Sequence, residues 1–272
     1  MESISEIFRI GTGPSSSHTM GPRKAVQQFI AEYPSAVNFE VYLYGSLAAT
    51  GKGHLTDKAI EDVLSPVGEL VINWCPDFVP QYHTNGMRIV GRDVCGIVLG
   101  DRTVYSVGGG KIVWDTEVSG ESDSKKSVYP MRRISDILEW CERTGKSYWE
   151  YVDDCEGEWI WDYLHEVWEV MKAAVERGLE AEGVLPGGLG VRRKAVSYYM
   201  KASGYSSSLK SRGLVYSYAL AVSEENASGG KIVTAPTCGS CGVLPSVLFH
   251  MQKFYNFSNQ RILRALATAG IF

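Results

Sequence analysis

The sequence predicts an α+β fold, with an N-terminal mixed α/β domain that has a small sheet, followed by a mainly α-helical domain. In the first half, short alternating segments are separated by glycine-rich turns, which is typical of strands. In the second half, large apolar residues recur every three or four positions, as on a helix face. Between them, residues 120–129 are polar and serine-rich, which indicates a linker. We therefore predict domains at 1–130 and 131–272, and we expect the second domain to be incomplete.

The first elements follow from local signals. Ser3 and Glu6 have the spacing of a capping box, which predicts a short helix. Residues 11–19 are rich in turn formers and small hydroxyl residues, so we expect a loop there. A helix over 21–33 follows, because Pro22 suits a first helical turn and apolar residues share one face.

The next segments predict a sheet with one more helix. Residues 39–44 alternate as a strand does, and 45–54 are small and flexible. Residues 56–64 have a helical pattern, with Thr56 as a plausible N-cap. Further short strands are expected at 87–90, 95–99, 103–107 and 111–114.

The second half predicts helices with one clear interruption. The pattern is helical from 134 to 177, and the Pro-Gly-Gly segment at 185–190 breaks it. Helices are expected near 194–203 and 213–225. The last segment, 260–271, reads as an apolar helix without a C-cap residue, so we expect a chain that stops within its second domain.

Composition excludes several classes of protein. The net charge is −4 and the pI is about 5.8, whereas nucleic-acid-binding domains are usually basic. No apolar run approaches the length of a membrane span, and the polar, acidic N-terminus does not resemble a signal peptide. The sequence thus predicts a cytoplasmic protein in which the six cysteines are not a disulfide framework.

Three histidines lie in small-residue or turn-like segments of the first domain: His18, His54 and His83. An imidazole exchanges protons near neutral pH and suits acid–base catalysis, although a lone loop histidine is more often structural. Ser15, Ser16, Ser17 and Thr19 surround His18 at the start of a predicted helix. Free backbone amides and hydroxyls at such a point favour an anion, either a carboxylate or a phosphate.

Cys238 and Cys241 form a Cys-x-x-Cys pair in the second domain. Such a pair can be redox-active or can supply half of a metal site. A zinc site needs four ligands, and the sequence has no second pair. We therefore expect small packing residues here, with metal binding by Cys238 and Cys241 as the weaker alternative.

Taken together, six segments in order resemble the iron–sulfur-dependent L-serine dehydratases (L-serine ammonia-lyases). The first half resembles the family's β domain and the second half the start of its helical α domain, joined as in the single-chain fused form. The segments are Gly13-Pro-Ser-Ser-Ser-His-Thr-Met-Gly-Pro22, Tyr44-Gly-Ser-Leu-Ala-Ala-Thr-Gly-Lys-Gly-His54, His83-Thr-Asn-Gly-Met87, Ser106-Val-Gly-Gly-Gly110, Leu185-Pro-Gly-Gly-Leu189 and Thr234-Ala-Pro-Thr237.

The resemblance implies an enzyme that converts L-serine to pyruvate and ammonia, with a [4Fe–4S] cluster as Lewis acid for the leaving hydroxyl. The resemblance also implies that His54 is the candidate base. His18 with the serine segment, and His83 with Asn85, would bind or orient the substrate. The matching positions Ser46, Lys52, Thr234 and Thr237 would also line the substrate site.

The same resemblance places the cluster ligands downstream of residue 272, so this chain alone could be inactive. It is compatible with a homodimer and leaves threonine open as a second substrate. Two other functions are alternatives to this enzyme activity. One is a serine-binding regulatory module without catalysis, and the other is a thiol redox or zinc protein built on Cys238 and Cys241.

Overall fold

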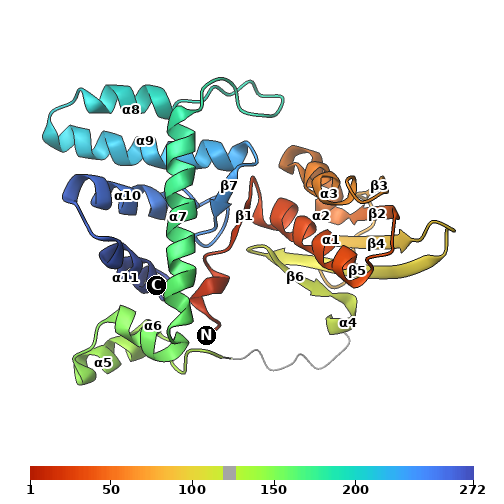
Figure 1. The fold of residues 1–272 in the computed structure, drawn as a ribbon, viewed down its shortest axis with the longest axis horizontal. Coiled ribbons are helices and arrows are strands. Elements are labelled where there is room, and N and C mark those ends of the chain that lie inside the picture. The colour runs from red at the N-terminus through yellow and green to blue at the C-terminus, as the bar shows by residue number, and fades with distance from the viewer. Residues whose placement is uncertain (119–126) are drawn as a thin grey trace. The chain divides into compact units, whose positions relative to one another are not determined.

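A computed structural model of the chain describes residues 1–118 and 127–272. The chain divides into two compact units. One, called here the α/β unit, is Thr12–Asp123, and the other, called the helical unit, is Met1–Gly11 together with Ser124–Phe272. The α+β fold class is therefore confirmed, since a mixed sheet and a helical region occupy separate parts of the chain (Figure 1).

The α/β unit is built on a five-stranded mixed sheet with the strand order β3-β2-β4-β5-β6. β3 pairs with β2 in parallel, and the other neighbours pair antiparallel. Its elements are η2 (Ser16–Met20), α1 (Gly21–Glu32), β2 (Asn38–Tyr44), α2 (Gly45–Thr50), η3 (Gly51–His54), α3 (Thr56–Leu64), β3 (Glu69–Cys75), β4 (Gly86–Arg92), β5 (Val98–Gly108), β6 (Lys111–Trp114) and α4 (Asp115–Val118).

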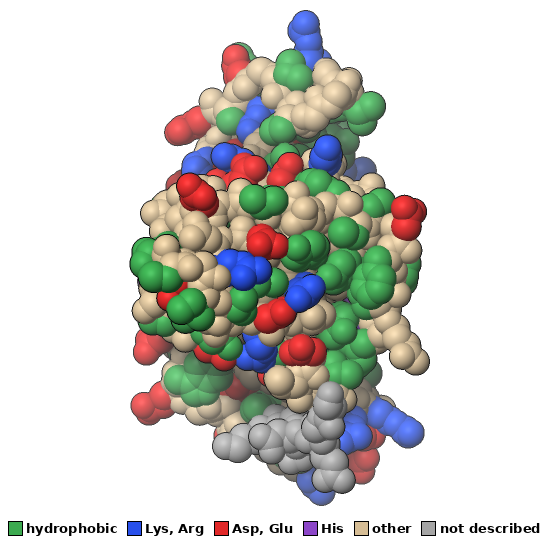
Figure 2. Space-filling view, turned by 90° about the vertical axis from the view of Figure 1, so that its right-hand side faces the viewer, with side chains coloured by type: hydrophobic (Ala, Val, Ile, Leu, Met, Phe, Trp, Pro, Cys, Tyr) green, Lys and Arg blue, Asp and Glu red, His purple; other side chains and the backbone are tan. Residues whose placement is uncertain are grey.

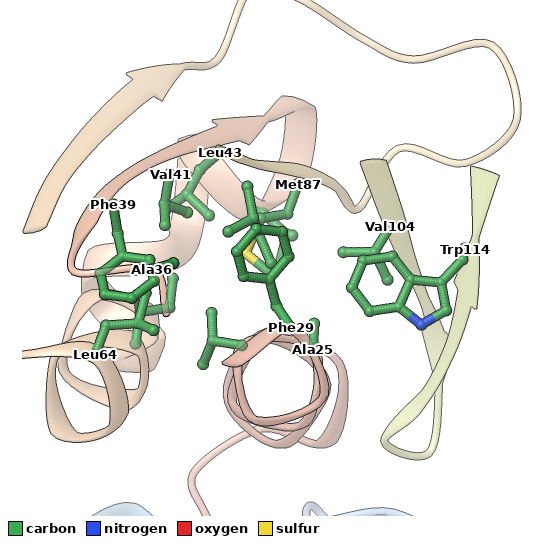
Figure 3. Close-up of a cluster of buried hydrophobic side chains, with 14 of the residues drawn as sticks. Ala25, Phe29, Ala36, Phe39, Val41, Leu43, Leu64, Met87, Val104 and Trp114 are labelled. Atoms are coloured by element: carbon green, nitrogen blue, oxygen red, sulfur yellow. The ribbon is translucent and has the colours of Figure 1, made fainter. Parts of the chain in front are cut away.

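The core of this unit lies between the sheet and its helices. Figure 3 shows Phe29 of α1 directed toward Met87 of β4, with Val104 and Trp114 beside them on the neighbouring strands. Phe29, Met87 and Val104 are almost completely buried. Strand residues alternate between two faces, so every second side chain of β2 reaches this core. The packing holds the ends of β2, β4 and β5 in place beside α1.

Some of the other strand side chains carry charge. Arg88 forms a two-point ion pair with Asp101 on the adjacent strand, with nitrogen–oxygen distances of 2.7 and 2.6 Å. Arg92 lies 3.4 Å from Glu40. On the face of the molecule seen in Figure 2, basic and acidic side chains are mixed with hydrophobic ones. Neither sign of charge dominates this face.

The helical unit packs around the long helix α7, which contacts most of the other elements. Trp168 of α7 is fully buried, and β1 pairs with β7 in a two-stranded sheet. Its elements are η1 (Ile4–Glu6), β1 (Ile10–Thr12), α5 (Ile134–Thr144), α6 (Tyr148–Glu156), α7 (Trp159–Glu180), α8 (Ala195–Ser203), α9 (Ser207–Ala227), β7 (Lys231–Val233), α10 (Val243–Tyr255) and α11 (Asn259–Ala269).

The N-terminal segment packs inside the helical unit. Ile4 and Phe8 are 2% and 1% exposed. A Cβ atom on Gly270 would come within 3.1 Å of both side chains, so that glycine permits the close approach. The carboxylate of Glu156 accepts hydrogen bonds from the amide of Ile4 at 2.9 Å and from the hydroxyl of Tyr129 at 2.8 Å. Tyr129, which the sequence placed in an exposed linker, is thus buried; residues 120–126 of that linker lie outside the described residues.

Several local predictions are confirmed: the short N-terminal helical turn, the helix after Gly21, the strand over 39–44 and the helix over 56–64. Two predicted loops are wrong, because 16–20 and 45–54 are helical. The predicted strand at 95–99 is correct only for 98–99, where β5 begins, and β1, β3, β7, α4 and α10 were not predicted. The division of the family domains at residue 130 stays a prediction, whereas the contacts group the first eleven residues with the helices.

Candidate active site

The serine-rich segment begins a helix, because its residues form a π-helical turn, η2, that continues into α1. Ser15 stands at the N-cap in an extended conformation, and its hydroxyl accepts a hydrogen bond from the amide of His18 at 3.1 Å. A helix start presents amides without intrahelical partners, and these favour an anion. The expected loop is thus a helical turn, and anion binding at its start stays a prediction.

His18 is held by polar groups on both sides of its ring. Its Nδ1 lies 3.0 Å from the hydroxyl of Ser17, and its Nε2 lies 3.3 Å from the carbonyl and 3.2 Å from the hydroxyl of Ser46. A carbonyl can only accept, so Nε2 carries the proton and Nδ1 accepts from Ser17. Burial, and then the neighbouring His54, lower the pKa of His18 below its ordinary value, so the ring is neutral at pH 7.

His54 stacks beside His18, with ring centroids 4.7 Å apart and planes inclined by 33°. Its Nδ1 lies 3.0 Å from the carbonyl of Thr50. Since a carbonyl cannot donate, Nδ1 carries the proton and the lone pair is on Nε2. The structure thus brings two of the three predicted histidines together, and it gives them opposite tautomers.

Two threonine hydroxyls cross-link the histidine segments. Thr19 donates to the carbonyl of His54, and Thr56 donates to the carbonyl of His18, each at 2.7 Å. Thr56 is fully buried at the start of α3. The prediction that Thr56 caps this helix is wrong, because its hydroxyl is directed to His18 instead. Only a view of the folded chain reveals this link, since the two residues lie 38 positions apart.

The predicted turn at His83 reaches the same region through Thr84. The carbonyl of Thr84 accepts a hydrogen bond from the amide of Ser46 at 3.1 Å. The amide of Asn85 donates to Nδ1 of His83 at 3.1 Å. Ser46, which contacts His18, therefore links the His83–Asn85 turn to the histidine pair. Thr84 was not predicted as a site residue from the sequence, and Thr56 was predicted only as a helix cap, because an isolated threonine carries no signal for such contacts.

Lys52, another predicted binding residue, is exposed in η3. Its ammonium group lies 5.4 Å from the centre of the Trp74 ring, a cation–π contact. The site therefore consists of η2, the end of β2 with α2, η3, and the turn before β4, all within the α/β unit. It presents a helix start with hydroxyls and backbone amides next to one imidazole whose lone pair is on Nε2.

The chain is similar to known proteins in both of its halves. Residues 3–65 match the family model described as serine dehydratase beta chain, and residues 87–272 match that of the serine dehydratase alpha chain. The L-serine dehydratase of Haemophilus influenzae is 36% identical, with 100% of this chain and 71% of the relative covered. The L-serine dehydratase of Streptomyces coelicolor is 35% identical over 98% of this chain and 70% of its own length. L-serine dehydratase 2 of Escherichia coli is 36% identical over 97% and 69%.

The chain belongs to the serine dehydratase family. Its resemblance to this family is thereby confirmed over both halves of the chain. The members are iron–sulfur-dependent, so the residues of this serine dehydratase must be compared with the needs of a cluster. Iron–sulfur clusters are held by several cysteine thiolates, four in the common types.

The cysteines of this serine dehydratase do not fit a cluster. Cys238 and Cys241 are each 1% exposed, and burial raises the pKa of both to about 12. Both are therefore thiols at neutral pH, packed before α10, and metal ions bind thiolates. Within residues 1–118 and 127–272, no three or more histidine, cysteine, aspartate or glutamate side chains gather as metal ligands would.

Thr234 and Thr237 belong to the helical unit of this serine dehydratase. The fully buried Thr234 hydroxyl donates to the carbonyl of Ile7 at 2.6 Å and accepts from the amide of Arg9 at 2.9 Å. It thus ties the N-terminal segment to the residues after β7. The exposed hydroxyl of Thr237 lies 3.1 Å from that of Ser240. Their predicted contact with substrate stays a prediction.

In the described part of the chain, no helix is both long and apolar enough to cross a membrane.

Proposed function

We propose that the chain catalyses the dehydration and deamination of L-serine to pyruvate and ammonia. The observation that carries this proposal is the His18–His54 pair at a serine-rich helix start, in a chain that aligns over its whole length with L-serine dehydratases. Removal of the α-proton and loss of the β-hydroxyl give aminoacrylate and water. Aminoacrylate tautomerises to an imine, which water hydrolyses to pyruvate and ammonia.

His54 is the proposed base. Because Thr50 holds the proton on Nδ1, the free lone pair on Nε2 can accept the α-proton of serine. His18 cannot take this role as readily, since both of its ring nitrogens are engaged by Ser17 and Ser46. His18 is also neutral, so it adds no positive charge beside the proposed base.

The groups around the His18–His54 pair would bind the substrate. The substrate carboxylate would lie at the start of η2, where Ser15, Ser16 and Ser17 combine hydroxyls with helix-terminal amides. Thr19 and Ser46 position the imidazoles through the contacts described above. The His83–Asn85 turn would orient the rest of the substrate. Lys52, Thr234 and Thr237 are kept as binding residues on the family resemblance alone.

The regulatory alternative, a serine-binding module without catalysis, is not favoured. The relatives that match both halves of this chain together are enzymes by name. A homodimer and a cytoplasmic location belong to the proposal as well. Sedimentation of the purified chain would measure its oligomeric state.

The experiment compares the wild type with His54→Gln, and with the control His165→Gln, which alters an exposed histidine of α7. Pyruvate formation from L-serine and loss of deuterium from α-deuterated L-serine are both measured. Removal of a general base typically costs about 10²–10⁴-fold in rate, so His54→Gln should lose both signals by that factor. His165→Gln should match the wild type.

Two results would contradict the proposal. If the wild type formed no pyruvate from L-serine, the activity would be wrong for this chain. If His54→Gln kept its rates within about twofold of a functioning wild type, the base would lie elsewhere, because a factor that small is less than the loss of a general base causes.

A further inference from the structure

Strand β3 forms one edge of the five-stranded sheet. It pairs with β2 over its whole length without a register shift, and no strand of the described residues pairs with its other side. Natural sheets usually protect such an edge with charged side chains, prolines, bulges or a covering segment. Apart from Glu69 at its start, β3 has no charged side chain, no proline and no bulge. Its outer side is therefore able to pair with a further strand.

The backbone of alternate β3 residues faces this outer side. The amide of Glu69 donates to the carbonyl of Val37 at 2.9 Å, so the backbone of Glu69 is directed toward β2. Successive residues of a strand direct their amides and carbonyls to opposite sides. Leu70, Ile72 and Trp74 therefore direct theirs away from β2, and each offers one donor and one acceptor to an added strand.

A groove of about 270 Å³ lies between β3 and the neighbouring helix α3 (Figure 1). Its lining comes from alternate residues of the strand and from one face of the helix: Leu70, Ile72, Trp74, Asp57, Glu61 and Ser65. The three strand side chains are only partly buried against the core. An open strand edge beside a helix, with a groove between them, suits an extended peptide that binds by strand addition.

The helix side of the groove is acidic. Asp57 and Glu61 lie four positions apart on α3, so both face the groove, and none of its described lining residues is basic. The ammonium group of Lys52, which contacts the Trp74 ring, offsets only part of this negative charge. A second copy of the chain, related by a twofold axis, would bring the same carboxylates toward each other. The charge therefore favours a basic partner over a second copy.

We propose that the groove between β3 and α3 binds an extended peptide segment in which basic and apolar residues alternate, as an additional strand of the sheet. The basic side chains lie on the side of α3, where their aliphatic stems cover Leu70 and Ile72 and their cations reach Asp57 and Glu61. The apolar side chains lie on the other face, beside Val71, which is 56% exposed. This binding uses none of the residues assigned to the reaction.

The experiment measures peptide binding to the full chain by fluorescence anisotropy at low ionic strength. The probe is a capped, fluorescein-labelled peptide of the sequence Val-Lys-Val-Lys-Val-Lys-Val. One control peptide has glutamate in place of lysine, which reverses the charge. Another has proline in place of the two inner valines, which keeps the charge but removes two backbone N–H groups.

Two double variants test the acidic wall of the groove. Asp57→Asn/Glu61→Gln removes its two carboxylates, and the matched control Glu139→Gln/Glu142→Gln removes two exposed carboxylates from α5. The wild type should bind the lysine peptide at least about tenfold more tightly than either control peptide. The groove variant should bind it about fivefold more weakly than the wild type, whereas the α5 variant should differ by less than about twofold.

Amide hydrogen exchange of the wild type, resolved by NMR, locates the peptide without any substitution. The bound peptide should slow exchange about tenfold or more at Leu70, Ile72 and Trp74, because new hydrogen bonds protect these amides. The amides of Val71 and Asn73 already face β2, so their exchange should change little.

Several results would overturn the inference. One is a lysine peptide that does not bind at about millimolar concentration, or that binds no better than the proline or glutamate peptide. Another is an affinity that both double variants lower equally, which would reflect net charge alone. Unchanged exchange at Leu70, Ile72 and Trp74 in the complex would place the peptide elsewhere. Protection of these amides that rises with protein concentration in the free chain would show that a second copy occupies the edge.

Discussion

His18 and His54 differ in what their ring nitrogens can do, although the sequence places both beside small residues. The difference comes from backbone carbonyls: Ser46 fixes the proton of His18 on Nε2, and Thr50 fixes that of His54 on Nδ1. Sequence reasoning could nominate both residues, because each lies in a segment that resembles the family. It could not distinguish their tautomers, because these depend on partners up to 28 positions away.

Thr56 is a residue whose importance depends on a single hydrogen bond. Replacing Thr56 with Val keeps the shape and leaves the carbonyl of His18 without its donor. An unpaired buried acceptor costs about 1–3 kcal/mol, so the free energy of unfolding should fall by that amount, and turnover should fall with it. Urea denaturation and pyruvate formation check both. Thr144→Val, which changes an exposed threonine in α5, should alter stability by less than about 0.5 kcal/mol; equal losses in the two variants would contradict this role.

The sequence predicted helices and strands best where one hydrophobic periodicity dominates a segment. The helix after Gly21, the alternating strand β2 and α3 were all recognisable from periodicity. The glycine-rich segment 45–54 was misjudged as flexible, because tertiary contacts stabilise α2 and η3 against the low helix propensity of glycine. β3 was missed because it completes its hydrogen bonds only with β2, more than 20 residues earlier.

Gly45 controls where α2 begins. Its φ is +47°, in the left-handed region, and a Cβ atom there would lie 2.5 Å from the carbonyl of Thr84. Gly45→Ala should therefore cost at least about 1–2 kcal/mol and displace Ser46, with faster hydrogen exchange in α2. Gly53→Ala is the matched control in η3, because nothing lies within 4 Å of its Cβ position. A Gly45→Ala protein as stable and as protected as Gly53→Ala would show that the turn tolerates a side chain.

In the whole molecule, the N-terminal segment is the part whose packing differs most from its place in the sequence. Ile4 and Phe8 are buried with the helices that follow residue 127, and Thr234 binds the backbone of Ile7 and Arg9. These contacts join positions more than 220 residues apart, which no local pattern encodes. The resemblance to a known family could locate the site residues in order, but only the fold shows that His18, His54 and Ser46 are in direct contact.

Stability of the whole molecule should depend on pH through one histidine in each unit. Burial, together with His54, lowers the pKa of His18, and burial lowers that of His250, each below the ordinary value of 6.5. The unfolded chain therefore binds protons more readily, so both histidines contribute stability above pH 6.5 that is lost as the pH falls through their folded pKa values. The slope between pH 7 and 5 should reach at most about 1.4 kcal/mol per pH unit for each histidine.

Urea denaturation at several pH values measures this slope, and His250→Gln should reduce it by removing the contribution of the helical unit. The nearby Ser211 hydroxyl, 2.8 Å from His250 Nε2, can keep a hydrogen bond to the glutamine amide, so the variant should remain folded. The pKa values of the Glu40, Asp101 and Glu150 carboxyls are lowered from ordinary values of 4.5, 3.8 and 4.5, so their contribution is lost mainly below pH 5 and adds little to the slope in this window. Stability that stayed constant or rose on acidification from pH 7 to 5 would mean that neither imidazole is held neutral by the fold.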